Sequence, residues 1–243
     1  MALAHVRFFS RSLEKASEMV VLIPEADQPG PYPVWYVLHG LSDDCTAWSQ
    51  YTTIQRAVEG LPMLVVMPDG GRGYYTDNAE GPAWESHFFL DVVPFVERNF
   101  SVRNQGACRV ISGHSMGGYG AIRFALRRPE MFVAAVGHSG AYLAAFERKD
   151  PEGVRIFGPA PDGGPNDLLS LASCVPLSEL PALRLDCGTE DYLLHHSRTL
   201  HERLTECGIE HDYHEYSGGH TWDYWQQRLP HTVGFVARSL GLP

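Results

Sequence analysis

A serine flanked by glycines is the residue with the clearest chemical potential in this sequence. Residues 113–117 read Gly-His-Ser-Met-Gly, a G-x-S-x-G pentapeptide centred on Ser115. The pentapeptide follows an apolar run that predicts a strand and opens a stretch that predicts a helix, which is the setting of a nucleophile elbow. In such an elbow the serine adopts a strained backbone, and a side chain at either glycine would collide with the neighbouring strand or helix. We therefore expect Ser115 to be a nucleophile.

A similar tetrapeptide, Gly-His-Ser-Gly at residues 137–140, also ends an apolar run. Its second glycine comes one place early, and no good helix pattern starts directly behind it. We expect Ser139 to line a pocket at most.

A serine hydroxyl is a poor nucleophile, so it needs a general base and a third group that orients that base. In the strand–turn–helix setting of the pentapeptide, the acid and then the histidine follow the serine along the chain. Asp191 follows a predicted strand and is the favoured acid, with its neighbour Glu190 as the alternative. His220 comes after the strand-like stretch 209–216 and two glycines that let a loop bend inward, so we expect it to be the base.

The negative oxygen of an acyl-transfer intermediate requires two preorganised backbone N–H donors. One would be Met116, directly after the serine at the positive end of a helix. The other is expected in the loop after His39-Gly40, with Leu41 as the donor.

Charge and motif content exclude several other classes of function. The 243 residues carry 19 basic and 29 acidic side chains, a net charge of −10, and no run of basic residues longer than a pair such as Arg127-Arg128. We therefore expect no nucleic-acid partner. No phosphate-binding glycine motif and no H-E-x-x-H spacing occurs, so we expect neither a nucleotide cofactor nor a metal. We expect most of the other histidines, namely His195, His196, His201, His211 and His214, to be ordinary surface groups.

The elements that must position these residues alternate along the chain. Glycine-bounded apolar runs predict buried parallel strands, and the longer stretches between them predict helices. The expected strands are 34–38, 63–67, 109–112, 132–136 and 183–187, and the expected helices are 53–59, 84–99, 117–128, 192–207 and 221–240. Two further runs, 5–9 and 19–23, lie too close together for a crossover helix and predict an antiparallel pair at the sheet edge. This pattern predicts a doubly wound α/β fold.

The stretch 139–181 interrupts this alternation, because it is rich in proline and glycine and contains no clear strand. Long insertions inside compact domains tend to cover a functional site, so we expect a cap-like insertion here. Triad candidates spread from 115 to 220 require one continuous sheet, so we expect residues 1–243 to form a single domain.

The remaining features bear on location and assembly. Five widely spaced cysteines without a C-x-x-C pair favour free thiols, and neither a signal peptide nor a membrane span is evident. We expect a cytoplasmic protein without membrane contact, and the sequence leaves a homo-oligomer open.

Around Ser115, Asp191 and His220 the sequence resembles the putative-esterase family of α/β hydrolases. This family includes tributyrin-esterase-type carboxylesterases, S-formylglutathione hydrolases and bacterial mycolyltransferases. The matching stretches are 36–42, 66–70, 74–77, 113–118, 187–191 and 218–225. The most specific is the ending His-Thr-Trp-x-x-Trp at 220–225. The resemblance implies an α/β-hydrolase fold with a mostly parallel sheet, an antiparallel N-terminal edge and helices on both faces. It also implies the same roles for Ser115, Asp191, His220, Leu41 and Met116.

The resulting expectation is a serine carboxylesterase that hydrolyses small or short-chain acyl esters. The alternatives are a thioesterase of the S-formylglutathione type, a carbohydrate acetyl or feruloyl esterase, and a non-catalytic binding module on a hydrolase scaffold. The thioesterase match is imperfect, because Cys45 stands four residues beyond Leu41 whereas the S-formylglutathione hydrolases place a cysteine soon after His-Gly-Leu. The expected pocket walls are Trp48, Tyr74, Trp84 and the segment that begins at Ser139, around a small-molecule ester substrate.

Overall fold

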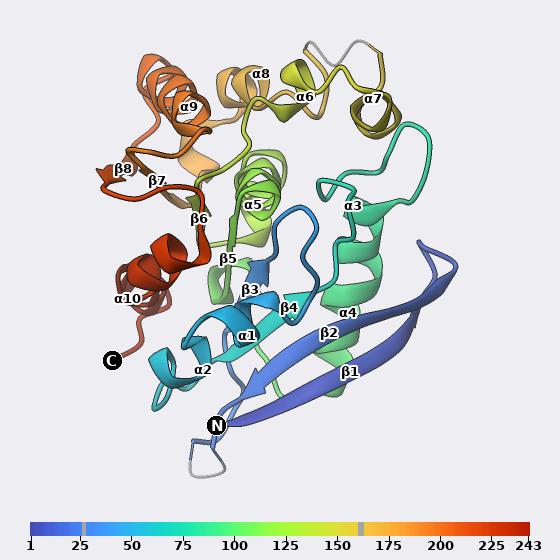
Figure 1. The fold of residues 1–243 in the computed structure, drawn as a ribbon. Helices are drawn as coiled ribbons and strands as arrows, with labels where there is room; N and C mark the ends of the chain where they lie inside the picture. The colour runs from blue at the N-terminus through green and yellow to red at the C-terminus, as the bar shows by residue number, and fades with distance from the viewer. Residues whose placement is uncertain (26–27, 160–162) are drawn as a thin grey trace.

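Eight strands form one mixed sheet in the computed structural model, which describes residues 1–25, 28–159 and 163–243 (Figure 1). Their order is β1-β2-β4-β3-β5-β6-β7-β8. The strands are Ala2–Ser10 (β1), Lys15–Ile23 (β2), Val34–Leu38 (β3), Leu64–Pro68 (β4), Arg109–His114 (β5), Ala134–His138 (β6), Ala182–Gly188 (β7) and His211–Tyr216 (β8). β1 and β2 are antiparallel to their neighbours, and all other pairs are parallel. The predicted α/β fold with an antiparallel N-terminal edge is confirmed.

The antiparallel strands β1 and β2 are longer than the sequence predicts, nine residues each rather than five. β1 alternates between exposed and more buried residues, so only part of it reads as an apolar run. Strand length at such an edge depends on the pairing partner, which a local pattern does not contain.

Helices cover both faces of the sheet. They are Ala47–Tyr51 (α1), Ile54–Ala57 (α2), Trp84–Ser86 (α3), Val93–Asn99 (α4), Met116–Arg127 (α5), Ala144–Glu147 (α6), Pro151–Phe157 (α7), Leu168–Cys174 (α8), Leu194–Glu206 (α9) and Trp222–Ser239 (α10). The helix predicted at 84–99 is one helical stretch, but its middle, His87–Val92, is π-helical. Among the described residues, no helix is both long and apolar enough to cross a membrane.

The continuous apolar strands supply two cores at once. Along β3, Tyr36 and Leu38 pack into the core shared with α4, α5 and α9, whereas Trp35 and Val37 pack into the core shared with α10. Successive side chains of a strand point to opposite faces, so an unbroken apolar run is what a sheet covered on both sides requires.

The segment 139–181 holds the short helices α6, α7 and α8, which lie together beyond one end of α5 (Figure 1). Its described residues contain no strand, and residues 160–162 lie outside the described part of the chain.

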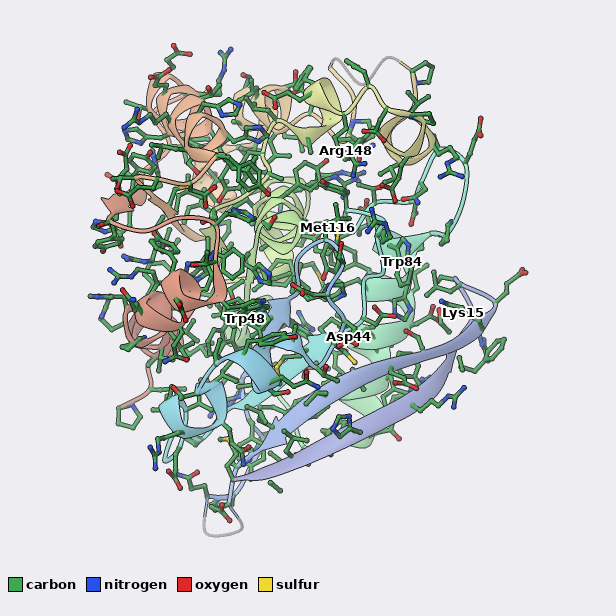
Figure 2. The ribbon with its side chains drawn as sticks, in the orientation of Figure 1. Lys15, Asp44, Trp48, Trp84, Met116 and Arg148 are labelled. Atoms are coloured by element: carbon green, nitrogen blue, oxygen red, sulfur yellow. The ribbon has the colours of Figure 1, made fainter. Side chains whose placement is uncertain are left out.

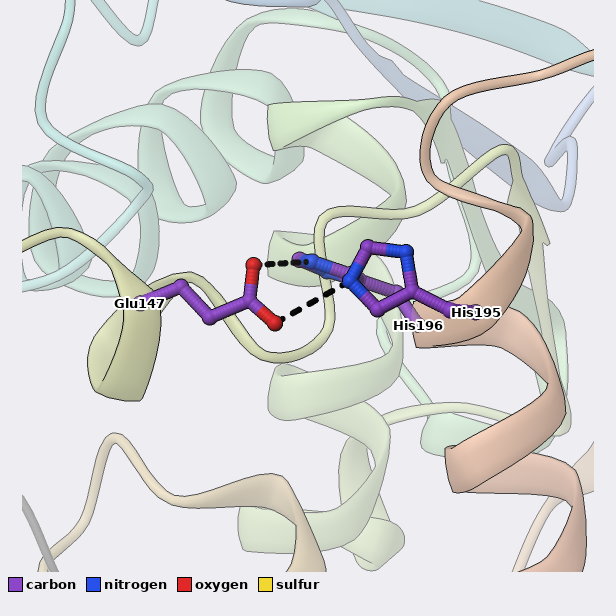
Figure 3. Close-up of side chains that lie close together, drawn as sticks. All are labelled: Glu147, His195 and His196. Carbon is purple, nitrogen blue, oxygen red and sulfur yellow. Dashed lines mark hydrogen bonds and ion pairs between the residues drawn. The ribbon is translucent and has the colours of Figure 1, made fainter.

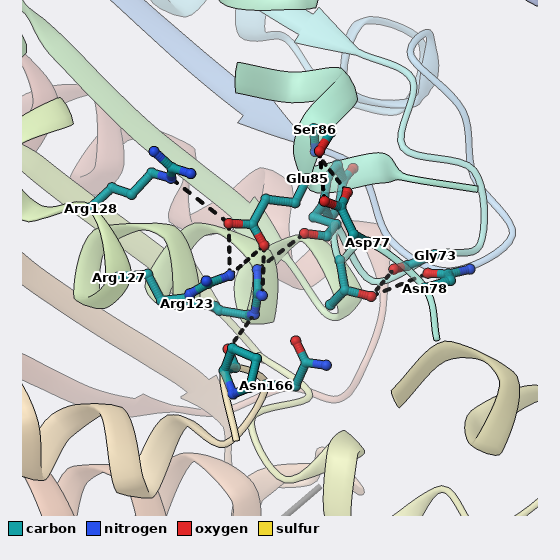
Figure 4. A network of polar contacts seen from close by, with 12 residues as sticks. Gly73, Asp77, Asn78, Glu85, Ser86, Arg123, Arg127, Arg128 and Asn166 are labelled. Atoms are coloured by element: carbon teal, nitrogen blue, oxygen red, sulfur yellow. Dashed lines mark hydrogen bonds and ion pairs between the residues drawn. The ribbon is translucent and has the colours of Figure 1, made fainter. Parts of the chain in front are cut away.

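A buried ion-pair cluster joins α3 to α5 (Figure 4). The Arg123 guanidinium is 1% exposed and donates to the Glu85 carboxylate at 2.7 Å and to the backbone oxygen of Pro165 at 3.0 Å. Arg127 donates to the same carboxylate at 2.7 Å, and Arg128 lies 3.8 Å from it. One carboxylate therefore compensates a fully buried arginine and faces two more.

We expect Glu85→Gln to lower the free energy of unfolding by about 3 kcal/mol, because the substitution leaves the buried Arg123 charge uncompensated. Urea denaturation at pH 7 measures this loss. Glu59→Gln removes the same charge from an exposed position and is the matched control. Equal stability of the two variants would contradict this role of Glu85.

Candidate active site

Ser115 stands at the turn between β5 and α5, in the backbone conformation of a nucleophile elbow. Its φ is +55° and its ψ is −117°, a region that residues with a side chain rarely adopt. Its amide donates to the His138 carbonyl on the neighbouring strand at 2.9 Å, which holds the strained turn in place.

The two glycines of the pentapeptide are required by close backbone contacts. A Cβ at Gly113 would lie 2.5 Å from the backbone of Gly117, and a Cβ at Gly117 would lie 2.4 Å from the Leu38 carbonyl oxygen. The first turn of α5 therefore packs directly against the end of β3, as the sequence predicts for this motif.

The structure brings Ser115, His220 and Asp191 together in one hydrogen-bonded row. His220 Nε2 lies 2.9 Å from Ser115 Oγ, and His220 Nδ1 lies 2.9 Å and 3.0 Å from the two Asp191 carboxylate oxygens. The loops after β7 and β8 that carry the acid and the histidine touch closely, since a Cβ at Gly188 would lie 2.0 Å from the Gly218 carbonyl oxygen.

The structure also distinguishes Asp191 from Glu190, the two residues that the sequence offers as the acid. Asp191 faces His220, whereas Glu190 is exposed and accepts hydrogen bonds from the Thr189 hydroxyl and the Gly218 amide. Burial opposes ionisation of Asp191, but hydrogen bonds from His220 and the Leu193 amide outweigh it and hold the pKa of Asp191 below its usual value. The row thus ends in an ionised carboxylate.

A second buried histidine–aspartate pair lies behind this row. His138 Nδ1 lies 2.9 Å from the Asp186 carboxylate, which also accepts a hydrogen bond from the Tyr224 hydroxyl at 3.1 Å. Trp225 Nε1 donates to Ser139 Oγ at 3.3 Å. These bonds fasten the start of α10, and with it the loop of His220, to β6 and β7.

Leu41 and Met116 lie on the two segments that meet at Ser115. Leu41 lines the cavity above the serine, in the loop that follows β3. Met116 is the first residue of α5, where the backbone N–H groups have no partner inside the helix.

A cavity of about 510 Å³ opens over Ser115 and His220. Its walls combine apolar, aromatic and charged side chains. They include Leu41, Tyr74, Ala141, Ala144, Tyr192, Leu193, Trp222 and Trp225, together with Asp43, Glu147, Arg148 and His196. Of the pocket residues expected from the sequence, Tyr74 lines this cavity, as do four residues of the segment after Ser139.

Three expected wall residues lie elsewhere. Trp48 is 3% exposed and packs under Trp222, donating its N–H to the Leu38 carbonyl at 3.0 Å. Trp84 packs over the chain at Gly71 and Gly73 and borders a separate depression, well apart from Trp48 in Figure 2. Ser139 is fully buried behind the hydrogen-bonded row of Ser115, His220 and Asp191. Each of the three supports the site or the core rather than lining the cavity, which corrects the expectation.

Sequence reasoning missed most of the remaining walls. Tyr192 and Trp222 stand one and two residues from Asp191 and His220, and this adjacency is a signal that could have found them. The Tyr192 ring lies tilted beside the His220 ring, with 4.6 Å between their centroids, and Tyr192 is 69% exposed, so it forms a rim of the cavity. Glu147 and His196 carry no comparable signal, since they meet only through the packing of α6 on α9.

Glu147, His195 and His196 form the one group with metal-ligand geometry that we find in the described residues (Figure 3). His196 Nε2 lies 2.8 Å from the Glu147 carboxylate, while its Nδ1 accepts the Leu143 amide at 3.0 Å. A ring whose Nδ1 accepts must carry its proton on Nε2, and that nitrogen then donates to Glu147 and has no lone pair for a metal. His196 is also 2% exposed, so it is not the surface group expected from the sequence.

The chain is similar to known proteins over nearly all of its length. The family model described as "Putative esterase" matches residues 10–236. The chain belongs to the putative esterase family. It is a carboxylic ester hydrolase, since its relatives are esterases and its structural neighbours are serine hydrolases.

The matches to curated relatives cover most of the length of this esterase. The acetyl esterase of Caldicellulosiruptor saccharolyticus is 25% identical over 264 residues, which cover 98% of this chain and 99% of that protein. Esterase Rv1288 of Mycobacterium tuberculosis is 28% identical over 239 residues, 85% of this chain but 52% of that protein, so the chain spans about half of its length.

Two solved structures from Staphylococcus aureus are similar at 26% identity, and both matches cover 97% of this chain and 98% of the other. FphF, a fluorophosphonate-binding serine hydrolase, superposes with a TM-score of 0.88. The S-formylglutathione hydrolase FrmB superposes with a TM-score of 0.85.

We expect Asp191→Asn to destabilise the esterase in a pH-dependent way. The pKa of Asp191 is lower in the folded chain than the value of about 3.9 in an unfolded one. The carboxylate therefore stabilises the fold above about pH 4, and this contribution disappears as the pH falls through the lower folded pKa. Urea denaturation from pH 7 to pH 3 should show the gap between wild type and variant narrowing as the pH falls. Asp223→Asn, at an exposed position, should show no such trend, and a constant gap for Asp191→Asn would contradict the assignment.

Proposed function

We propose that the protein is a serine carboxylesterase of small or short-chain acyl esters, with Ser115, His220 and Asp191 as its catalytic triad. The observation that carries the proposal is the 2.9 Å contact between His220 Nε2 and Ser115 Oγ, continued by the contact of Nδ1 with Asp191. A nucleophile, a base within hydrogen-bond reach and a group that orients the base are the parts that acyl transfer requires.

The reaction proceeds in two steps through an acyl-enzyme. Ser115 Oγ attacks the ester carbonyl while His220 Nε2 takes the hydroxyl proton, and Asp191 holds the ring through Nδ1. The backbone N–H groups of Leu41 and Met116 stabilise the negative oxygen of the tetrahedral intermediate. His220 returns the proton to the departing alcohol, and water then attacks the acyl-enzyme by the same route and releases the acid.

The cavity supports a small substrate. Its volume of about 510 Å³ has to hold both the acyl and the alcohol part of the ester. The charged side chains Glu147 and Arg148 stand in its wall beside aromatic rings, which disfavours a long alkyl chain along that wall. The relative named acetyl esterase, which matches over its full length, is consistent with a short acyl group.

A thioesterase of the S-formylglutathione type is the second candidate. It is favoured by the likeness to the FrmB structure over nearly the whole chain. The same triad chemistry serves both reactions, so only the alcohol or thiol side of the cavity distinguishes them.

We propose further that residues 1–243 form one domain and that the segment 139–181 acts as its cap. Ala141, Ala144, Glu147 and Arg148 of this segment stand in the cavity wall, which supports that role.

Ser115→Ala should abolish the activity, because it removes the nucleophile and leaves the fold intact. We expect kcat for p-nitrophenyl acetate to fall by about 10⁴-fold or more. A fluorophosphonate probe should label the wild type and the control Ser173→Ala, an exposed serine, but should not label Ser115→Ala. Retained esterase activity in Ser115→Ala would refute the proposal.

A series of p-nitrophenyl esters from acetate to laurate should show kcat/KM falling as the acyl chain lengthens, because the charged side chains in the cavity wall disfavour a long alkyl chain. S-formylglutathione assayed beside the series tests the second candidate. A preference for acyl chains beyond about eight carbons would contradict the small-acyl proposal, given a cavity in the ordinary range for small ligands. A kcat/KM for S-formylglutathione far above that for every ester would favour the thioesterase.

A further inference from the structure

The turn at residues 40–43 carries Leu41 and is held in an unusual backbone conformation. The Asp43 amide donates to the Gly40 carbonyl at 3.2 Å, which closes a four-residue turn. Ser42, the third residue, has a φ of +76°, as a type II turn requires, although glycine is the residue that normally supplies it. A turn of this kind costs free energy, so contacts elsewhere must fix it.

The Asp43 side chain makes such a contact with the residue next to the nucleophile. Its Oδ2 lies 3.0 Å from Nε2 of His114, which directly precedes Ser115. Gly40 lies against this pair, since a Cβ at that position would stand 2.5 Å from His114 Nε2 and 3.2 Å from Asp43 Oδ2. The hydrogen bond therefore joins the last residue of the turn to the strand that carries the serine, and Gly40, the first residue, packs against the same pair.

The His114 ring is a rigid support. It is 1% exposed and packs against Trp225 at 4.1 Å, Trp222 at 4.5 Å and Trp48 at 5.3 Å between ring centroids. Burial lowers the pKa of His114 to about 4, although Asp43 acts in the opposite direction, so the ring is neutral at pH 7. Its Nδ1 has no partner among the described residues, and a neutral ring that donates through Nε2 leaves that nitrogen unprotonated.

We propose that Asp43 is a positioning residue, which accepts the His114 Nε2 proton and so holds the turn at 40–43 with the Leu41 N–H aimed at the oxygen that becomes negative on Ser115 attack. This inference rests on the proposed function. The positioning role explains why the charged Asp43 side chain stands in the cavity wall beside the nucleophile, since its partner is His114 and not the substrate. A second anchor acts on the same turn, since Arg72 donates to the Ser42 hydroxyl at 3.1 Å.

The test compares Asp43→Ala, which removes the acceptor, with Asp43→Asn, which keeps a neutral acceptor of the same shape. Asp44→Ala removes a charge from the adjacent exposed residue and is the matched control. Losing one oxyanion donor altogether costs about 10²–10³-fold in kcat. We expect Asp43→Ala, which displaces the donor without removing it, to lower kcat for p-nitrophenyl acetate by about 10–100-fold with KM changed less than about threefold. Asp43→Asn should stay within about fivefold of the wild-type kcat.

A second readout separates positioning from a general loss of structure. A trifluoromethyl ketone forms a hemiketal with the serine and places a negative oxygen where the transition state does, so its affinity should fall in Asp43→Ala by the same factor as kcat/KM. The affinity for an uncharged product-like alcohol should not change. If Asp43→Ala fails to fold, Asp43→Ser, which is too short to reach His114, replaces it.

The outcomes are separable from those of the proposed function, which fails if Ser115→Ala remains active. The positioning role is overturned if folded Asp43→Ala keeps the wild-type kcat, or if its KM rises at constant kcat, which would indicate substrate contact. It is also overturned if Asp43→Asn loses as much activity as Asp43→Ala, since the negative charge and not the hydrogen bond would then matter.

Discussion

The close packing of α5 against the end of β3 is the constraint on which the rest of this structure depends. Gly117 allows the first turn of the helix to approach the Leu38 carbonyl to a distance that no side chain permits. The same approach forces Ser115 into a φ of +55° and presents its hydroxyl above the sheet. It also sets the loop after β3 beside the positive end of the helix, where a negative oxygen is best stabilised.

Around that contact, hydrogen bonds to neighbouring strands hold two loops at the carboxyl end of the sheet. The His220 loop is held through the start of α10, where the Tyr224 hydroxyl donates to Asp186 and the Trp225 N–H donates to the Ser139 hydroxyl. The turn at 40–43 is held by the hydrogen bond between the Asp43 carboxylate and His114 Nε2. Polar groups buried in this way are costly unless they are satisfied, so they specify one arrangement of the loops rather than simply adding stability.

The sequence predicts the parts of this site that depend on local geometry. The place of each triad candidate after a strand, the glycines of the elbow and the two-sided burial of β3 all follow from residue types within a few positions. The choice between Asp191 and Glu190 needed the structure, because adjacent residues at the end of a strand differ only in which way the loop turns them.

The residues of the cavity wall could not be predicted from the sequence either. Glu147 and His196 are 49 residues apart in the chain and meet only through tertiary packing. Trp48 and Trp84 are residues of a type common in pocket walls, but elements distant in the sequence bury them, and no local pattern predicts that contact.

The central claim is that an acyl group passes through Ser115. Rapid quenching of the protein during turnover of p-nitrophenyl acetate, followed by mass spectrometry of the digested chain, tests it directly. After digestion with trypsin, the account predicts a single acetyl group on the peptide 110–123, and fragmentation of that peptide should locate the group at Ser115. An acetyl group on another residue during turnover, or steady product release with no covalent adduct at any time, would contradict it.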